Sequence, residues 1–245
     1  MGSITSETNI NYLELEDLNM DTSKTAESVR KRTLLETVFE CITIVVHMLA
    51  LGLTIFIIYL CFLDSSFNLR TWHVLLYTVG WFLLSAEGIL FIMKDNIFSK
   101  RISPRWRSHG HWMIITLGIA LTIAGFATIF ASKTNHFTSV HGITGLTSGI
   151  LGCITCLSGI PALFSAKLRR KIPPNWSKLC HAFFGTAAVI LGVVALITAF
   201  YKNWFVSKTS DAVVVICLTI TVIITCWTLL RPGLNMYNRA KSLFS

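Results

Sequence analysis

The chain has 245 residues, of which 53% are hydrophobic and only 13% are charged. Soluble domains of this length carry about twice that share of charged residues, so the composition excludes an ordinary globular protein. The formal net charge of +9 would suit a nucleic-acid-binding protein, but the basic residues lie in short segments between long apolar stretches. We therefore expect an integral membrane protein.

Six apolar stretches are long enough to cross a bilayer, which takes about 20 residues each. In chain order they cover residues 41–63, 72–93, 111–131, 141–164, 181–201 and 212–230. The loops between them are too short to hold another domain. Because a chain inside lipid must satisfy its own backbone hydrogen bonds, the sequence predicts an all-α membrane protein with six transmembrane helices.

The segments outside the spans indicate how the chain is oriented. Residues 1–37 are polar and predict a disordered tail, which precedes a six-helix domain at 38–237 and a short tail at 238–245. Seventeen of the 21 Lys and Arg residues lie in the terminal segments and in alternate loops. By the positive-inside rule, this distribution predicts that both termini are cytoplasmic.

Four histidines, His73, His111, His141 and His181, open successive apolar stretches. An ionisable side chain inside a membrane is costly without a partner, so four in corresponding positions predict a shared function. Neighbouring spans run in opposite directions, which places His73 with His141 near one membrane face and His111 with His181 near the other. The positive-inside rule assigns the His111–His181 pair to the cytoplasmic side.

Imidazole is the commonest metal ligand among side chains, and two that face each other suit the axial positions of a haem iron. Zinc sites usually gather three or four ligands at one point. The sequence contains no Cys-x-x-Cys-His motif for covalent attachment. The expected cofactors are therefore two non-covalent b haems, each bound by one histidine pair. Small residues follow each histidine at helical spacing, and they would either admit a flat macrocycle or allow close helix packing.

Four short motifs carry these histidines: Trp72-His73, His111-Trp112, His141-Gly142 and His181-x-x-x-Gly185. Their order and spacing resemble those of the cytochrome b561 transmembrane reductases over about residues 41–237. Within that family, the segment 47–52 looks most like the branch of cytochrome b561 domain-containing protein 2. The resemblance implies a central bundle of the second to fifth spans that holds both haems. It also implies ascorbate as cytoplasmic donor, and monodehydroascorbate radical or ferric iron as acceptor on the other side.

The branch further implies residence in the endoplasmic reticulum or a cytoplasmic vesicle membrane, and the sequence leaves a homodimer open. Ascorbate is an anion at neutral pH, so basic side chains shortly before the cytoplasmic histidines are candidate donor contacts. These are Arg105, Arg107 and Lys178, which also satisfy the positive-inside rule without any substrate. His136, in the loop before His141, is a candidate contact for the acceptor.

Glu87 is a carboxylate deep within the second span, where an unpaired charge costs about 2.5 to 3.5 kcal/mol. In a regular helix it continues the face of His73 and Gly80. We expect it to bond a group near the cytoplasmic haem, such as the second ring nitrogen of a ligating histidine, or to link helices. His47 in the first span is expected to form an interhelical hydrogen bond or to carry a redox-linked proton.

A second class of function uses the same residues. The histidines and Glu87 would form a proton relay in a haem-free transporter or channel. Reduction by a quinone is a further alternative, which keeps the haems and changes only the donor. An optical spectrum separates the first two classes, because only a haem protein has a Soret band.

Overall fold

The computed structural model describes residues 4–63 and 67–244. It divides into two compact units, Met1–Ile42 and Thr43–Ser245, and the functional residues lie in the second. Six of the described helices are long and apolar enough to cross a membrane. The expected all-α membrane fold with six spans is therefore confirmed.

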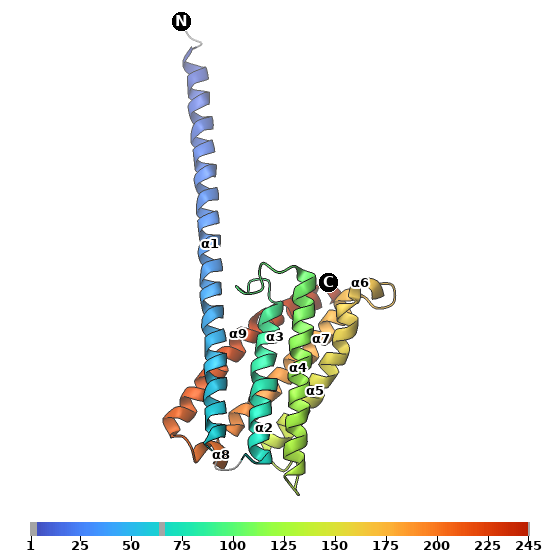
Figure 1. Cartoon of the computed structure of the whole chain (residues 1–245). Coiled ribbons are helices and arrows are strands. Elements are labelled where there is room, and N and C mark those ends of the chain that lie inside the picture. The colour runs from blue at the N-terminus through green and yellow to red at the C-terminus, as the bar shows by residue number, and fades with distance from the viewer. Residues whose placement is uncertain (1–3, 64–66, 245) are drawn as a thin grey trace. The chain divides into compact units, whose positions relative to one another are not determined.

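The second span is one rod built from three segments, and the remaining spans are single helices (Figure 1). The rod comprises α2 (Leu69–Tyr77), the π-helical η1 (Thr78–Leu84) and α3 (Ser85–Ile92). The other spans are α1 (Ile4–Phe62), α4 (Pro104–Ala131), α5 (Val140–Leu163), α7 (Pro174–Ala199) and α9 (Asp211–Phe244). Short helices α6 (Ser165–Leu168) and α8 (Asn203–Val206) lie in the connections.

The helices begin before the apolar stretches do. Side-chain oxygens of Asn68 and Ser139 accept hydrogen bonds from backbone N–H groups in the first turns of α2 and α5. Pro104 and Pro174 open α4 and α7, because the fixed φ of proline suits the first helical position. The helix that contains the third apolar stretch therefore begins about two turns before His111, because its first turns are polar.

The terminal segments are helical where the structure describes them. The backbone of α1 is helical from Ile4, through the segment whose composition predicts disorder. The disorder expected of residues 1–37 stays a prediction. At the other end α9 continues to Phe244, and Arg239 donates a hydrogen bond to Asn175 of α7 at 3.2 Å.

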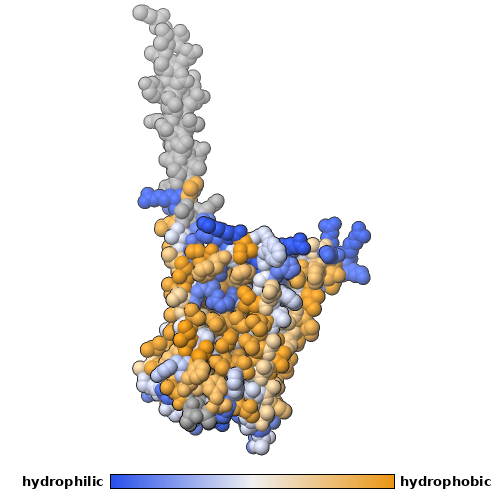
Figure 2. All heavy atoms as spheres, viewed as in Figure 1, coloured by the Kyte–Doolittle hydropathy of each residue, from blue (hydrophilic) through white to orange (hydrophobic). Residues whose placement is uncertain are grey.

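The apolar core of the second unit does not lie on the axis of the four histidine-bearing spans. It lies where α1, the α2–α3 rod and α9 meet, and it includes Val46, Leu53, Phe82, Leu90 and Ile224. Hydrophobic residues also cover the side of this unit in Figure 2, between hydrophilic ends, as a lipid-facing surface requires. The axis of the four-helix bundle is thus left for histidines, glycines and a cavity.

Candidate functional site

The structure brings the four histidines together as two pairs at opposite ends of the bundle. His73 of α2 faces His141 of α5, with ring centroids 6.2 Å apart and ring planes at 87°. His111 of α4 faces His181 of α7 with the same centroid separation and planes at 86°. These are the two pairs that antiparallel threading groups in the sequence.

The separation within each pair matches two ligands on one metal ion. Metal–imidazole bonds are about 2 Å long and the nitrogen lies about 1 Å from the ring centre, so opposite ligands of one ion have centroids about 6 Å apart. The centroid distances of 6.2 Å agree with this value at both pairs. Among the described residues no group of three or more His, Cys, Asp and Glu side chains gathers around a common point.

Every one of the four imidazoles has its Nδ1 against a backbone carbonyl oxygen. The contacts are His73 to Gly125 at 3.0 Å, His111 to Gly88 at 2.7 Å, His141 to Ala195 at 2.9 Å and His181 to Thr155 at 3.1 Å. A carbonyl oxygen can only accept, so each Nδ1 donates its proton and each neutral ring keeps the lone pair on Nε2. Metal-ligating histidines are oriented by bonds of this kind.

These hydrogen bonds are reciprocal within two helix pairs. The α2–α3 rod packs on α4, and α5 packs on α7. Each helix carries a histidine at one end and an acceptor carbonyl about four turns later, as His111 and Gly125 do on α4. The bundle therefore consists of two halves: the first is the α2–α3 rod with α4, and the second is α5 with α7. Each half orients its own two imidazoles and presents them to the other half.

The rod breaks this regular spacing by one residue. Fourteen residues separate His111 from Gly125, whereas fifteen separate His73 from Gly88 on the rod. The additional residue is absorbed by η1, because a π-helical turn holds one more residue than an α-helical turn. Gly88, rather than Glu87, consequently shares the face of His73.

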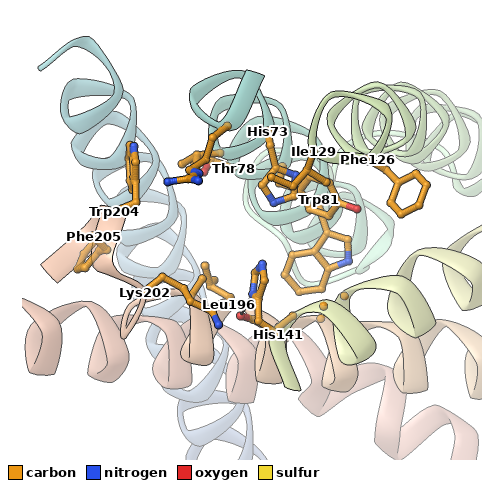
Figure 3. A pocket seen from close by; sticks show the side chains of 18 of the residues that line it. His73, Thr78, Trp81, Phe126, Ile129, His141, Leu196, Lys202, Trp204 and Phe205 are labelled. Atoms are coloured by element: carbon orange, nitrogen blue, oxygen red, sulfur yellow. Dashed lines mark hydrogen bonds between the residues drawn. The ribbon is translucent and has the colours of Figure 1, made fainter. Parts of the chain in front are cut away.

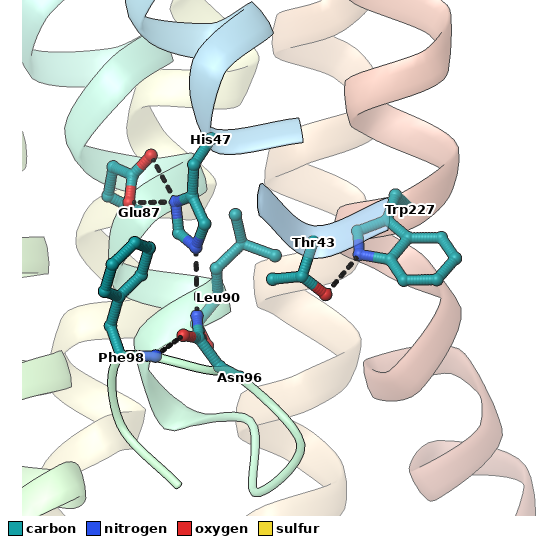
Figure 4. Close-up of polar contacts among 7 residues, drawn as sticks. All are labelled: Thr43, His47, Glu87, Leu90, Asn96, Phe98 and Trp227. Atoms are coloured by element: carbon teal, nitrogen blue, oxygen red, sulfur yellow. Dashed lines mark hydrogen bonds and ion pairs between the residues drawn. The ribbon is translucent and has the colours of Figure 1, made fainter. Parts of the chain in front are cut away.

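Glu87 therefore bonds no paired histidine and instead links two helices, which is the alternative that the sequence left open. Its carboxylate accepts from His47 Nδ1, at 2.9 Å to Oε1 and 2.7 Å to Oε2 (Figure 4). The amide of Asn96 lies 3.2 Å from His47 Nε2 and is oriented by the Phe98 backbone N–H, which donates to Asn96 Oδ1. The interhelical hydrogen bond expected of His47 is thus confirmed, with Glu87 as its partner.

A cavity of about 610 Å³ lies at the His73–His141 pair. Figure 3 shows both imidazoles pointing into it from opposite helices, with Trp81 beside them. Gly145 and Gly192 line its wall, and the missing side chain of Gly192 leaves room there for the ring of Trp81. The volume is in the range of sites for small molecules and cofactors.

Gly80 and Gly118, between the α2–α3 rod and α4, allow close helix packing, which is the other role that the sequence left open for small residues. A Cβ on Gly80 would lie 2.7 Å from the carbonyl oxygen of Gly118, and the reverse distance is also 2.7 Å. These two residues therefore allow the rod and α4 to cross closely, and their small size does not enlarge the cavity.

The candidate donor contacts lie on the helix turns before His111 and His181. Arg107 is one turn before His111 and is half-buried, with a buried Nε that has no hydrogen-bond partner among the described residues. Lys178 is half-buried one turn before His181, whereas Arg105 is exposed. Arg107 and Lys178 thus share a helix face with the paired histidines, and Arg105 does not.

His136 lies at the mouth of the cavity and stacks on Phe130, with ring centroids 4.1 Å apart and planes at 12°. Seventeen of the 21 Lys and Arg residues lie in the terminal segments and alternate loops, and three of the remaining four line this cavity: Arg70, Lys133 and Lys202. Among the residues that the structure describes, no Asp or Glu lines the cavity. The described lining therefore carries positive charge.

Two features of the site were not predicted from the sequence: the backbone carbonyls that accept from the histidines, and the contact between Trp81 and Ser148. The acceptor carbonyls belong to residues of any type, and a fourteen-residue spacing would have indicated three of the four, because Gly88 follows His73 by fifteen residues. Trp81 and Ser148 lie between the two pairs, where the indole Nε1 donates to the hydroxyl of Ser148 at 3.1 Å. An indole and a hydroxyl within apolar spans have many structural uses.

Comparison with known proteins identifies relatives of this arrangement. The family model of eukaryotic cytochrome b561 matches residues 72–206, which is more than half of the chain. The transmembrane reductase CYB561D2 is 26% identical over 189 residues in Mus musculus and in Homo sapiens, covering 73% of this chain and 82% of each relative. The probable transmembrane reductase CYB561D1 of Homo sapiens is 27% identical over 183 residues, with 73% and 79% covered. No solved structure matches the chain significantly.

Proposed function

The chain belongs to the eukaryotic cytochrome b561 family, and on that premise we propose a dihaem reductase that takes single electrons from cytoplasmic ascorbate. The electrons leave on the other side of the membrane, to monodehydroascorbate radical or ferric iron. The relatives are named transmembrane reductases, which supports oxidoreductase activity and electron transport in general. The particular donor and acceptor are our proposal.

The observation that carries this proposal is the geometry of the two histidine pairs. In each pair, two imidazoles whose Nδ1 atoms are bonded to backbone carbonyls have their ring centroids at the separation that one metal ion requires. We propose that His73 and His141 would hold one haem b, and that His111 and His181 would hold the other. The cavity at the His73–His141 pair supports the presence of a bulky cofactor there.

A bound haem supplies one-electron chemistry at its iron, and the chain supplies ligands, orientation and surroundings. The carbonyl oxygens of Gly88, Gly125, Thr155 and Ala195 hold the four imidazoles in one tautomer. The two halves of the bundle thus present preoriented ligands, so that binding a cofactor need not reorder the helices.

On the donor side we propose Arg107 and Lys178 as the principal contacts for ascorbate, with Arg105 contributing charge near the surface. A guanidinium and an ammonium would attract the anion and place it near the His111–His181 pair. The buried Nε of Arg107 without a partner supports this role, because such a donor gains a hydrogen bond when an anion arrives.

On the acceptor side we propose His136 as a contact, together with Arg70, Lys133 and Lys202. Their positive charge suits the monodehydroascorbate radical anion, or ferric iron carried by an anionic chelator, better than a bare cation. We further propose that both termini are cytoplasmic, on the strength of the basic-residue distribution. Residence in the endoplasmic reticulum or a vesicle membrane rests on the family branch alone.

Purified protein tests the proposal directly. We expect b-type absorption bands that sharpen when ascorbate is added, and two haems per chain. Because the imidazole planes are nearly perpendicular in each pair, both oxidised haems should give strongly anisotropic low-spin resonance signals. Absence of a Soret band would instead favour a haem-free proton relay, and reduction by a quinol but not by ascorbate would change the donor.

A further inference from the structure

The two halves of the bundle each have a close contact midway between the two histidine pairs. Gly80 and Gly118, which cross in contact, each lie seven residues after the histidine of their own helix, His73 and His111. Seven residues of helix span about 10 Å, so this crossing lies midway between two histidine levels about 20 Å apart.

The second half repeats the pattern with a hydrogen bond. Ser148 lies seven residues after His141, and Ala188 lies seven residues after His181. The buried Ser148 hydroxyl donates to the Ala188 carbonyl oxygen at 2.7 Å. This contact is therefore at the same depth as the glycine crossing of the first half.

Trp81 extends from the first half to the second at this depth. It follows Gly80 directly in η1, and its indole Nε1 donates to the Ser148 hydroxyl at 3.1 Å. Because the Ser148 hydroxyl donates its hydrogen to the Ala188 carbonyl oxygen, it can only accept from the indole. The hydrogen bonds therefore run from Trp81 to Ser148 and from Ser148 to Ala188.

The ring of Trp81 occupies the space above Gly192 of α7. A Cβ built on Gly192 would clash with the Cζ2 and Cε2 atoms of the indole. A hydrogen bond to Nε1 thus holds one edge of the indole, and Gly192 leaves room for its six-membered ring. It also lines the cavity of the His73–His141 pair, so it touches the region where that cofactor would lie.

We propose that Trp81 is the bridging residue between the two redox centres, and that Ser148 and Gly192 position it. The inference rests on the proposed dihaem function. With both haems bound, one electron would pass from the haem held by His111 and His181, which would be oxidised, to the haem held by His73 and His141, which would be reduced. No covalent bond changes, no proton moves and the indole keeps its own oxidation state.

The physical role of the indole is to fill the midpoint of a long gap with a rigid, polarisable group. Electron tunnelling weakens steeply as the number of through-space jumps increases. An aliphatic side chain at position 81 would leave space beside Gly192 and lengthen the jump, whereas phenylalanine would retain most of the aromatic bridge. The hydrogen bond to Ser148 determines where the ring lies, so its removal should have a smaller effect than loss of the ring.

The test compares Trp81→Leu, Trp81→Phe and Ser148→Ala with Trp227→Leu as the matched control. Trp227 of α9 makes the same kind of bond, from indole Nε1 to the Thr43 hydroxyl at 3.2 Å, outside the four-helix bundle. Haem spectra and midpoint potentials are recorded first. The rate at which electrons then pass from the ascorbate-reduced haem to the second haem is followed by rapid-mixing absorption spectroscopy.

We expect Trp81→Leu to slow this transfer by about tenfold or more, equivalent to about 1.4 kcal/mol in the barrier. Trp81→Phe and Ser148→Ala should lie between Trp81→Leu and the unmodified protein, and Trp227→Leu should transfer at the unmodified rate. Ultraviolet resonance Raman spectra should show a weakened hydrogen bond at one indole in Ser148→Ala. That band reports the position of Trp81 independently of activity.

Unchanged transfer in Trp81→Leu, with both haems present at their normal potentials, would overturn the role of Trp81 and leave the proposed function standing. Absence of two haems in the unmodified protein would instead overturn the proposed function. If Trp81→Leu does not fold, transfer in Trp81→Phe and Ser148→Ala decides: normal rates in both contradict the proposal, and slowed rates with normal spectra support it.

Discussion

His111 donates from Nδ1 to the carbonyl oxygen of Gly88 at 2.7 Å, the shortest of the four histidine–carbonyl contacts. Gly88 faces α4 because the π-helical η1 adds one residue to the rod between it and His73. The same extra residue turns Glu87 away from His111 and toward His47 of α1. One irregular turn therefore determines which group orients an imidazole and which group anchors a peripheral helix.

Gly192→Ala should destabilise the protein by about 1 to 3 kcal/mol, because the new methyl group would clash with the rigid indole of Trp81. Gly149→Ala is the matched control on α5, where no atom lies within 4 Å of the added Cβ. It should be neutral or slightly stabilising, since alanine favours the helix. Thermal unfolding in detergent micelles measures both. Equal stability of the two variants would show that the Trp81 ring can move without cost.

Arg107→Gln should raise the Michaelis constant for ascorbate by roughly tenfold, the effect of losing a charged hydrogen bond of about 1.5 kcal/mol. Lys178→Gln should act in the same direction. The control is Arg105→Gln, which removes the same charge from an exposed position on another helix face. Initial rates of haem reduction at varied ascorbate concentration give the three constants. Similar constants for Arg105→Gln and Arg107→Gln would reduce the role of Arg107 to general surface charge.

Neutralising Arg70, Lys133 and Lys202 together should slow electron delivery to an anionic ferric chelate and leave delivery to a neutral acceptor unchanged. These residues line the cavity, and attraction of an anion is a long-range electrostatic effect. Raising the ionic strength should abolish the difference, because exposed charges are screened within about 10 Å at 0.1 M salt. Lys208→Gln, outside the cavity lining, is the control variant. An equal loss with both acceptors would point to damage of the haem site.

Glu87→Gln should raise the midpoint potential of the haem assigned to His111 and His181, since it removes a negative charge next to the Gly88 carbonyl. Asp95→Asn is the control, because Asp95 pairs with Arg231 of α9 and does not adjoin an acceptor carbonyl. Potentiometric titration gives both values. A shift no larger than that of Asp95→Asn would leave Glu87 with the sole role of fixing α1 through His47.

The sequence predicted the spans and the grouping of the histidines, because apolar length and alternating direction are strong constraints in a membrane. Asn68, Ser139 and the prolines at 104 and 174 mark the helix starts in the sequence, because these residue types favour the first positions of a helix. The expected face of Glu87 was wrong because the spacing argument assumed a regular helix. Nothing in the residues 78–84 marks a π-helical turn.

The backbone acceptors were missed for a different reason. Thr155 and Ala195 act through their carbonyl oxygens, which every residue possesses, so their side chains give no indication of the role. Trp81 could be recognised only once α5 and α7 were placed beside η1, because its partners Ser148 and Gly192 are distant in sequence. Such contacts depend on tertiary packing.

The most direct test of the account is to replace each paired histidine by alanine and to record which haem changes. His73→Ala and His141→Ala should alter the same set of spectral bands, and His111→Ala and His181→Ala should alter the other set. Loss of one axial ligand can leave a five-coordinate haem, so the spectrum and the low-spin resonance signal are measured together with haem content. A crossed pattern, in which His73→Ala matches His111→Ala or His181→Ala, would contradict the pairing on which the dihaem account depends.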